Sequence, residues 1–119
     1  MPPLRIYTPV LHYVYTAVIY EWDERKNALN LRKHGLRFEA AVQVFADPDC
    51  LIEQNFDDPE TGEPRWLAIG LAPAYGLELV VIHVYRTVET IEGQEPQEVI
   101  RVISAREADP RESRRYQGV

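Results

Sequence analysis

The sequence predicts one α+β domain, with two N-terminal helices packed on a mainly antiparallel sheet of about four strands, plus a C-terminal helix. The chain has 119 residues, close to the commonest size of a single domain. Helix-type periodicity occurs before residue 46, and strand-type patterns dominate after residue 50. Strands grouped in this way, rather than alternating with helices, favour an antiparallel sheet.

The first residues, 1–19, form an N-terminal extension that precedes the domain at 20–119. Its apolar run, VLHYVYTAVIY at 10–20, is too short to span a bilayer and has no signal-peptide features. A β-branched, tyrosine-rich run is typical of a strand. We expect either an added strand or a non-native extension from an early start codon, no membrane segment, and a cytoplasmic protein.

Two helices follow. Asp23 is the expected N-cap of a helix that runs to about His34, where Gly35 ends it. The second helix, FEAAVQVF, carries an apolar stripe at i, i+3, i+4 and i+7, formed by Phe38, Ala41, Val42 and Phe45. The segment ADPD ends this helix because proline cannot continue it.

The first helix carries an unusual stripe, in which Lys26, Asn30 and His34 lie on one side between Leu29 and Leu31. A polar stripe that faces the protein body predicts one wall of a site. The alternatives are a solvated lysine, an asparagine bonded to nearby backbone, and a histidine that interacts with the helix dipole.

The strand candidates are CLIEQN, RWLAIGLA, LELVVIHVY and EVIRVISA. Turn-rich segments separate them: the acidic FDDPETGEP, the short PAYG and the longer RTVETIEGQEPQ. Residues 107–117 predict a polar C-terminal helix with Pro110 in its first turn.

The net charge of −6 argues against a generally sticky nucleic-acid binder. However, seven of the 19 acidic residues lie between Ala46 and Pro64, where no base occurs. The first helix and the C-terminal tail are locally basic.

Metal and cofactor motifs are not apparent. The three histidines lie far apart without metal-ligand spacing, and no phosphate-binding glycine loop or GxSxG elbow occurs. The single cysteine, Cys50, excludes an internal disulfide, fits a reducing compartment, and is expected to fill space in a strand. We therefore expect no cofactor and no metal.

Cations on the predicted elements are the candidate functional groups: Lys26, Arg65, Arg86, Arg101 and Arg106. Cleavage of RNA without a metal requires a proton acceptor for the 2′-hydroxyl, cations that stabilise the phosphorane-like transition state, and a proton donor. Arginine binds phosphate in bidentate fashion, and a lysine near other cations titrates closer to neutrality. His83 is either a core histidine or a catalytic one, and Arg106 could instead cap a helix or pair with Glu107 or Glu112.

The segment EWDERKNALNLRKHGLRFEAAVQVFADP resembles the start of the BrnT family, toxins of type II toxin–antitoxin modules. EPRWLAIG resembles the family's Glu-x-Arg…Gly segment, and LVVIHVYR and VIRVISAREA resemble its later blocks. Glu112 and Tyr116 are also in register, so the resemblance covers roughly 20–117. Residues 1–19, the long TVETIEGQEPQE connection and the acidic net charge depart from the family pattern.

The resemblance implies a RelE-like α+β fold and a metal-independent endoribonuclease that halts translation. It also implies neutralisation by a BrnA-like ribbon-helix-helix antitoxin, through which alone the toxin contacts DNA. Carried over by position, the catalytic candidates are Lys26, Arg65, His83, Arg86 and Arg106. Lys26 and His83 would transfer protons, and the arginines would hold phosphate.

Two other functions are open. A catalytically inactive binding module would keep the antitoxin-docking surface, and it predicts that Arg65, His83 and Lys26 do not face a common groove. An unrelated enzyme acting on small anions predicts a deep, enclosed pocket.

Overall fold

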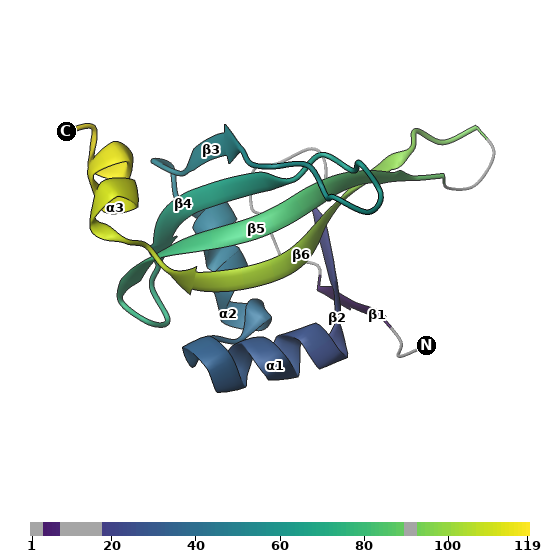
Figure 1. The fold of residues 1–119 in the computed structure, drawn as a ribbon. Helices are drawn as coiled ribbons and strands as arrows, with labels where there is room; N and C mark the ends of the chain where they lie inside the picture. The colour runs from purple at the N-terminus through teal and green to yellow at the C-terminus, as the bar shows by residue number, and fades with distance from the viewer. Residues whose placement is uncertain (1–3, 8–17, 90–92) are drawn as a thin grey trace.

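The computed structural model in Figure 1 describes residues 4–7, 18–89 and 93–119. Its sheet has six strands in the order β1-β2-β6-β5-β4-β3. They are β1 (Leu4–Tyr7), β2 (Ile19–Asp23), β3 (Leu51–Gln54), β4 (Trp66–Ala72), β5 (Leu77–Val88) and β6 (Gln97–Glu107). All neighbours are antiparallel except β2 and β6, which are parallel.

The α+β class and the mainly antiparallel sheet are confirmed, but the expected number of about four strands is too low. The additional pairing lies at the N-terminal edge, where β1 pairs with β2. Short edge strands depend on their neighbours more than on their own sequence, so a local pattern identifies them poorly. β1 lies within the expected extension, whereas most of the apolar run at 10–20 is outside the described residues.

The first helix, α1 (Glu24–His34), begins and ends as expected. The Asp23 side chain accepts a hydrogen bond from the Arg25 backbone N–H at 2.8 Å. Gly35 has a φ of 73°, the left-handed conformation that glycine adopts easily, and its N–H donates to the Leu31 carbonyl.

The second predicted helix divides into two. It begins as α2 (Phe38–Ala41) and tightens into a 3-10 helix, η1 (Val42–Ala46). Gly70 on β4 makes room for this segment, because a β-carbon at Gly70 would lie 2.8 Å from a Val44 methyl carbon and 3.0 Å from its carbonyl oxygen. The close contact places η1 directly on the sheet.

The two faces of the sheet differ in what covers them. The packed face, which carries Ala68, Leu79, Val81, His83 and Val102, forms the main core with Tyr20, Trp22 and the α2–η1 segment. Figure 1 shows α2 behind the sheet, and α1 lies beside β6 and β2.

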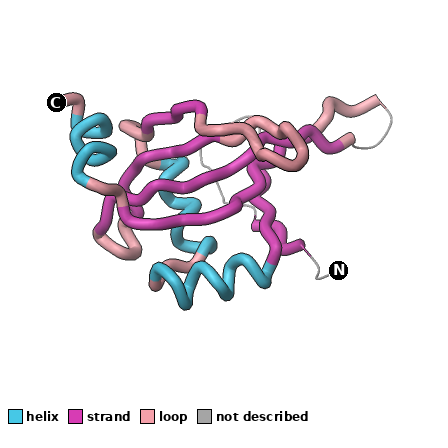
Figure 2. Tube along the Cα trace, in the orientation of Figure 1, coloured by secondary structure: helices cyan, strands magenta, loops and turns pink. Residues whose placement is uncertain are grey.

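The opposite face carries Leu67, Ile69, Val80, Ile82, Arg86 and Arg101, and we name it the arginine face. The C-terminal helix, α3 (Pro110–Gln117), covers one end of it, where Tyr116 packs on the cluster of Leu67, Ile69 and Val80. Pro110 lies in the first turn of α3, as expected. Figure 2 shows the same arrangement, with α3 and α1 at separate margins of the sheet. No helix among the described residues is long and apolar enough to cross a membrane.

Candidate functional site: an arginine-lined sheet face

Arg65, Arg86 and Arg101 share the arginine face with Arg106, which lies near α3. Side chains alternate between the two faces along a strand, and directly opposed residues on neighbouring strands point to the same side. Arg101 on β6 lies opposite Val84 on β5, and Arg86 follows Val84 by two residues. Arg65 comes just before Trp66, which lies opposite His83 and contacts Tyr85 on the packed side. Arg65 therefore points to the same side as Arg86 and Arg101.

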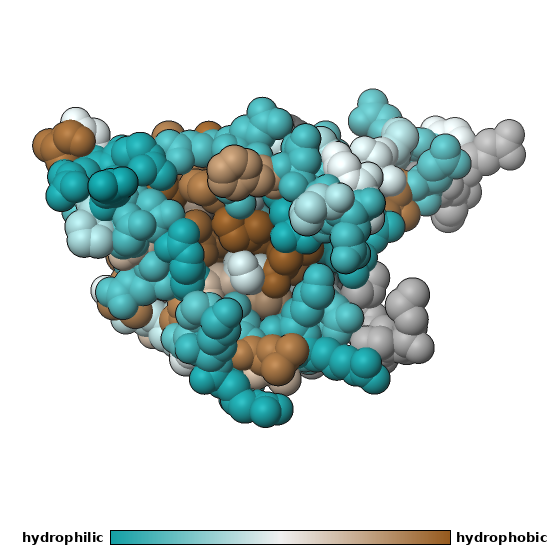
Figure 3. All heavy atoms as spheres, viewed as in Figure 1, coloured by the Kyte–Doolittle hydropathy of each residue, from teal (hydrophilic) through white to brown (hydrophobic). Residues whose placement is uncertain are grey.

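The floor between these arginines is apolar. Figure 3, in the orientation of Figure 1, shows apolar side chains in a hollow over the central strands, with hydrophilic side chains around it. The hollow is open to solvent rather than enclosed. The Arg65 and Arg86 side chains are 30% and 39% exposed, so both remain accessible.

Of Arg65, Arg86 and Arg101, two are paired with carboxylates. Arg86 on β5 forms an ion pair with Glu21 on β2, a residue only 6% exposed. Arg65 donates to Asp58 at 2.6 Å. Arg101 makes no ion pair with any residue that the structure describes. The site therefore combines two oriented guanidinium groups with one free guanidinium group.

The β3–β4 loop holds Asp58 in place. The Asp58 carboxylate accepts hydrogen bonds from the backbone N–H groups of Glu60 and Thr61, at 2.8 and 3.2 Å. These bonds, with the charge of Arg65, lower the pKa of Asp58. The Nε of Arg65 is buried and lacks a hydrogen-bond partner in the described part of the chain.

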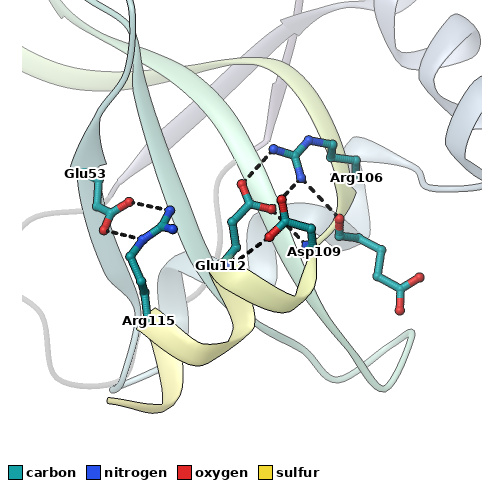
Figure 4. Close-up of polar contacts among 6 residues, drawn as sticks. Glu53, Arg106, Asp109, Glu112 and Arg115 are labelled. Carbon is teal, nitrogen blue, oxygen red and sulfur yellow. Dashed lines mark hydrogen bonds and ion pairs between the residues drawn. The ribbon is translucent and has the colours of Figure 1, made fainter. Parts of the chain in front are cut away.

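Arg106 is occupied by a structural contact. Its two terminal nitrogens donate to the two carboxylate oxygens of Glu112 at 2.7 and 2.8 Å, and Figure 4 shows this contact at the start of α3. Glu112 also completes a capping box with Asp109, whose side chain accepts from the Glu112 N–H. The hydrogen bonds with Arg106 lower the pKa of Glu112. Pairing with Glu112 was one of the alternatives that the sequence left open for Arg106.

His83 lies on the packed face and is fully buried. Its ring has edge contacts with Phe45 and Tyr85, with ring centres 4.8 and 5.0 Å apart. Nδ1 lies 3.1 Å from the Val81 carbonyl oxygen, so Nδ1 carries the proton, and Nε2 has no partner among the described residues. Burial lowers the pKa of His83, which favours the neutral ring.

The polar stripe of α1 is divided between solvent and interior. Lys26 and His34 are exposed, whereas Asn30 is buried and Leu29 is 58% exposed. The Asn30 amide donates to the Ala105 carbonyl at 2.9 Å and accepts from the Ala105 N–H at 3.0 Å. The expectation that the stripe faces inward is wrong for Lys26 and His34. Of the stripe, Asn30 is the residue that faces the sheet, because it bonds the backbone of β6.

Cys50 is partly buried next to β3, and burial raises the pKa of its thiol to about 11. The thiol is protonated at neutral pH and is therefore a poor nucleophile. This agrees with the space-filling position expected from the sequence.

The five sequence candidates thus divide into three groups. Arg65 and Arg86 lie on the arginine face, and Arg106 lies on the same face near α3. His83 is on the other side of the sheet, and Lys26 is on the exposed surface of α1. Arg101 was among the candidate cations in the sequence but not among the five catalytic candidates, and Glu21 was in neither group. A charged residue between two buried aromatic residues, as in Tyr20-Glu21-Trp22, was a signal that could have identified Glu21.

The fold and the site together define an α+β domain with an open sheet face lined with arginines, side chains that can bind anions. Residues 22–112 match the family model described as "Ribonuclease toxin, BrnT, of type II toxin-antitoxin system". The match covers most of the chain, and the chain belongs to this family. The resemblance noted in the sequence is therefore confirmed. No curated protein matches the chain significantly.

Proposed function

We propose that the chain is a metal-independent endoribonuclease that cleaves RNA on the arginine face and thereby inhibits translation in the cytoplasm. The grouping of Arg65, Arg86 and Arg101 over an apolar floor carries this proposal. Planar guanidinium groups bind phosphate in bidentate fashion, and fixed cations stabilise the charge that develops on the phosphorane. An open hollow accommodates a chain better than a small molecule, which counts against an enzyme for small anions.

The cleavage chemistry is attack of the 2′-oxygen of RNA on the neighbouring phosphorus. The 2′-oxygen–phosphorus bond forms while the bond to the 5′-oxygen breaks, which leaves a 2′,3′-cyclic phosphate and a 5′-hydroxyl. Arg101 has no ion pair in the described structure, so it can bind a phosphate without first releasing a carboxylate. Arg65 becomes available when a phosphate replaces Asp58, which sits in a loop at the surface.

The roles suggested for Lys26 and His83 in proton transfer remain predictions. His83 is buried on the opposite face of the sheet and Lys26 is exposed on α1, so neither residue is placed to exchange a proton with RNA bound on the arginine face. The partner that we propose is a BrnA-like ribbon-helix-helix antitoxin, which would neutralise the toxin and make any contact with DNA. Membership of a type II toxin–antitoxin family supports an antitoxin partner.

The test is controlled induction of the chain in a bacterial host, followed by incubation of the purified protein with RNA in excess chelator. We expect growth arrest and cleavage by the wild type. Arg65→Ala and Arg101→Ala should each reduce the cleavage rate by about 10²–10³-fold, the typical cost of removing one transition-state donor. Arg114→Ala, an exposed arginine on α3, is the matched control and should cleave like the wild type.

Each result has a distinct meaning, provided that thermal melting shows all variants to be folded. Cleavage that requires a divalent cation would overturn metal independence. Full activity of both hollow variants would place the site elsewhere on the molecule.

A second candidate is a catalytically inactive binding module that docks an antitoxin-type partner. It is favoured by one observation, namely that Arg65, His83 and Lys26 do not face a common groove. Folded wild-type protein that leaves RNA intact and growth unaffected would support this module over the ribonuclease.

A further inference from the structure

Glu21 is a buried carboxylate within the arginine face. It lies opposite Arg101 in the parallel pairing of β2 with β6, so both side chains point to the same side of the sheet. Its Oε1 accepts the ion-pair hydrogen bond from Arg86. A glutamate that is only 6% exposed thus lies next to Arg101 on the neighbouring strand and is paired with Arg86, and both arginines belong to the proposed RNA site.

The second oxygen of Glu21 has no assigned contact. Among the described residues, none donates a hydrogen bond to Oε2. Oε2 is also absent from the buried side-chain atoms that lack a hydrogen-bond partner in the described structure. Oε2 is therefore a free acceptor that remains reachable from solvent. By contrast, Glu112 uses both oxygens for Arg106 and the capping box, as a purely structural carboxylate does.

Stability alone does not account for this arrangement. An ion pair with one buried partner costs desolvation energy, and apolar replacements of such pairs are often neutral or stabilising. A carboxylate fixed by one arginine, with its other oxygen free beside a second arginine, has the geometry of a general base next to bound phosphate.

We propose that Glu21 is the proton acceptor of the ribonuclease reaction, an inference that rests on the function proposed above. Oε2 takes the proton of the 2′-hydroxyl as the 2′-oxygen bonds to phosphorus. The phosphorus–5′-oxygen bond breaks, and the departing 5′-oxygen takes a proton from water in the open hollow. Arg86 holds the carboxylate, and Arg101 and Arg65 hold the phosphate. Glu21 supplies the base that neither Lys26 nor His83 supplies from its position in the structure.

The test compares Glu21→Gln with the wild type in cleavage of RNA and in binding of a 2′-O-methyl RNA, which lacks the reacting hydroxyl. We expect a loss of about 10²–10⁴-fold in cleavage, the usual contribution of a general base. Binding of the methylated RNA should be unchanged or tighter, since a negative charge is removed. Glu53→Gln is the matched control, because Glu53 is also paired with an arginine, Arg115, and should retain wild-type cleavage.

The pH profile separates a catalytic role from a positioning role. The wild-type rate should rise with pH as a carboxylate ionises, and the residual rate of Glu21→Gln should lose that rise. Glu21→Asp keeps the carboxylate but moves it back by one methylene group. This variant should therefore cleave RNA more slowly than the wild type while keeping the pH dependence of the rate. This second variant also serves if Glu21→Gln does not fold.

Three outcomes would overturn the inference. Wild-type cleavage by folded Glu21→Gln would exclude Glu21 as the base while leaving the ribonuclease function intact. An equal loss of cleavage and of binding to methylated RNA would reduce Glu21 to a support for Arg86. A wild type that does not cleave RNA at all would overturn the proposed function and this inference together.

Discussion

Two buried asparagines attach α1 to the rest of the fold. Asn30 joins α1 to β6 by bonding both backbone groups of Ala105, and it also donates to the Leu36 carbonyl. Asn27 accepts from the Phe38 N–H and so caps α2 from a neighbouring helix. Each amide satisfies buried backbone groups that would otherwise be unpaired.

Replacing Asn30 should therefore be costly. We expect Asn30→Ala to lower the free energy of unfolding by about 2–4 kcal/mol, because it leaves buried backbone groups unpaired. Urea denaturation monitored by circular dichroism measures the change. Arg32→Ala, exposed on the same helix, should stay within about 0.5 kcal/mol of the wild type. If Asn30→Ala were as stable as the wild type, water would have to replace the hydrogen bonds that the Asn30 amide makes to the backbone.

The buried His83 makes the stability of the protein depend on pH. Burial lowers the pKa of His83 in the folded protein. At pH values between that lowered pKa and the ordinary pKa of about 6.5, the unfolded chain therefore binds more protons than the folded chain. The free energy of unfolding then rises with pH across this window, and the protein loses stability on acidification below about pH 6.5.

His83→Phe should weaken this pH dependence, since phenylalanine fills the same aromatic pocket without titrating. Urea denaturation at pH 7.5 and at pH 5.5 provides the comparison. The difference in stability between the two pH values should be smaller in the variant than in the wild type. His34→Gln, at the exposed end of α1, should keep the wild-type difference. An unchanged difference in His83→Phe would assign the dependence to other groups.

At the scale of elements, α3 depends on a few polar contacts. Glu112 binds Arg106 of β6 and caps α3 itself, and the Tyr116 hydroxyl donates to Asp47 at the end of η1. The ion pair of Arg115 with Glu53 adds a contact to β3, visible in Figure 4. The family-like residues Arg106, Glu112 and Tyr116 therefore hold the C-terminal helix on the sheet.

Glu112→Gln tests this attachment. We expect the free energy of unfolding at pH 7 to fall by about 1–3 kcal/mol, through loss of a charged hydrogen-bond pair and a weaker cap. The pKa of Glu112 is lower in the folded state than in the unfolded chain. The ionised carboxylate therefore stabilises the fold at pH values above its pKa in the unfolded chain, and this stabilisation is lost as the pH falls through its pKa in the folded state. Acidification should consequently narrow the gap between wild type and variant.

The control for this substitution is Arg111→Ala, an exposed change on α3 that should leave stability within about 0.5 kcal/mol. Thermal and urea unfolding measure both variants. A gap between Glu112→Gln and the wild type that is the same at pH 3 and pH 7 would show that the ionised carboxylate is not what stabilises α3.

At the scale of the whole molecule, an acidic protein has one sheet face lined with arginines. The net charge is −6, and the β3–β4 loop that supplies Asp58 to Arg65 is part of the acidic segment. Glu60 and Glu63 in this loop are exposed. Their charges oppose the approach of RNA to the neighbouring hollow, an effect that salt screens.

Removing one of these charges should strengthen RNA binding. We expect Glu60→Gln to increase affinity for 2′-O-methyl RNA by about 1.5–3-fold at low ionic strength, and less at high ionic strength. Fluorescence anisotropy at the two salt concentrations measures the effect. Glu107→Gln, which removes the same charge at the far end of β6, should change affinity less. If the two variants bind equally well, RNA does not pass near the β3–β4 loop.

Local chemistry in the sequence determined much of the fold. Asp23 and Gly35 bound α1 because capping and left-handed geometry depend on only a few adjacent residues. The strands from β3 to β6 and the helix α3 follow from alternation and proline placement for the same reason. The family resemblance was likewise contained in the order of residues, and the family match confirms it.

Tertiary structure alone decided which of these residues meet. Whether His83 shares a face with the arginines depends on strand register, and a shift of one residue moves a side chain to the other face. The inward side of α1 was determined by Asn30 reaching a backbone 75 residues away. Glu21 approaches Arg86 and Arg101 only because β2 pairs in parallel with β6, a contact between segments that no local pattern in the sequence connects.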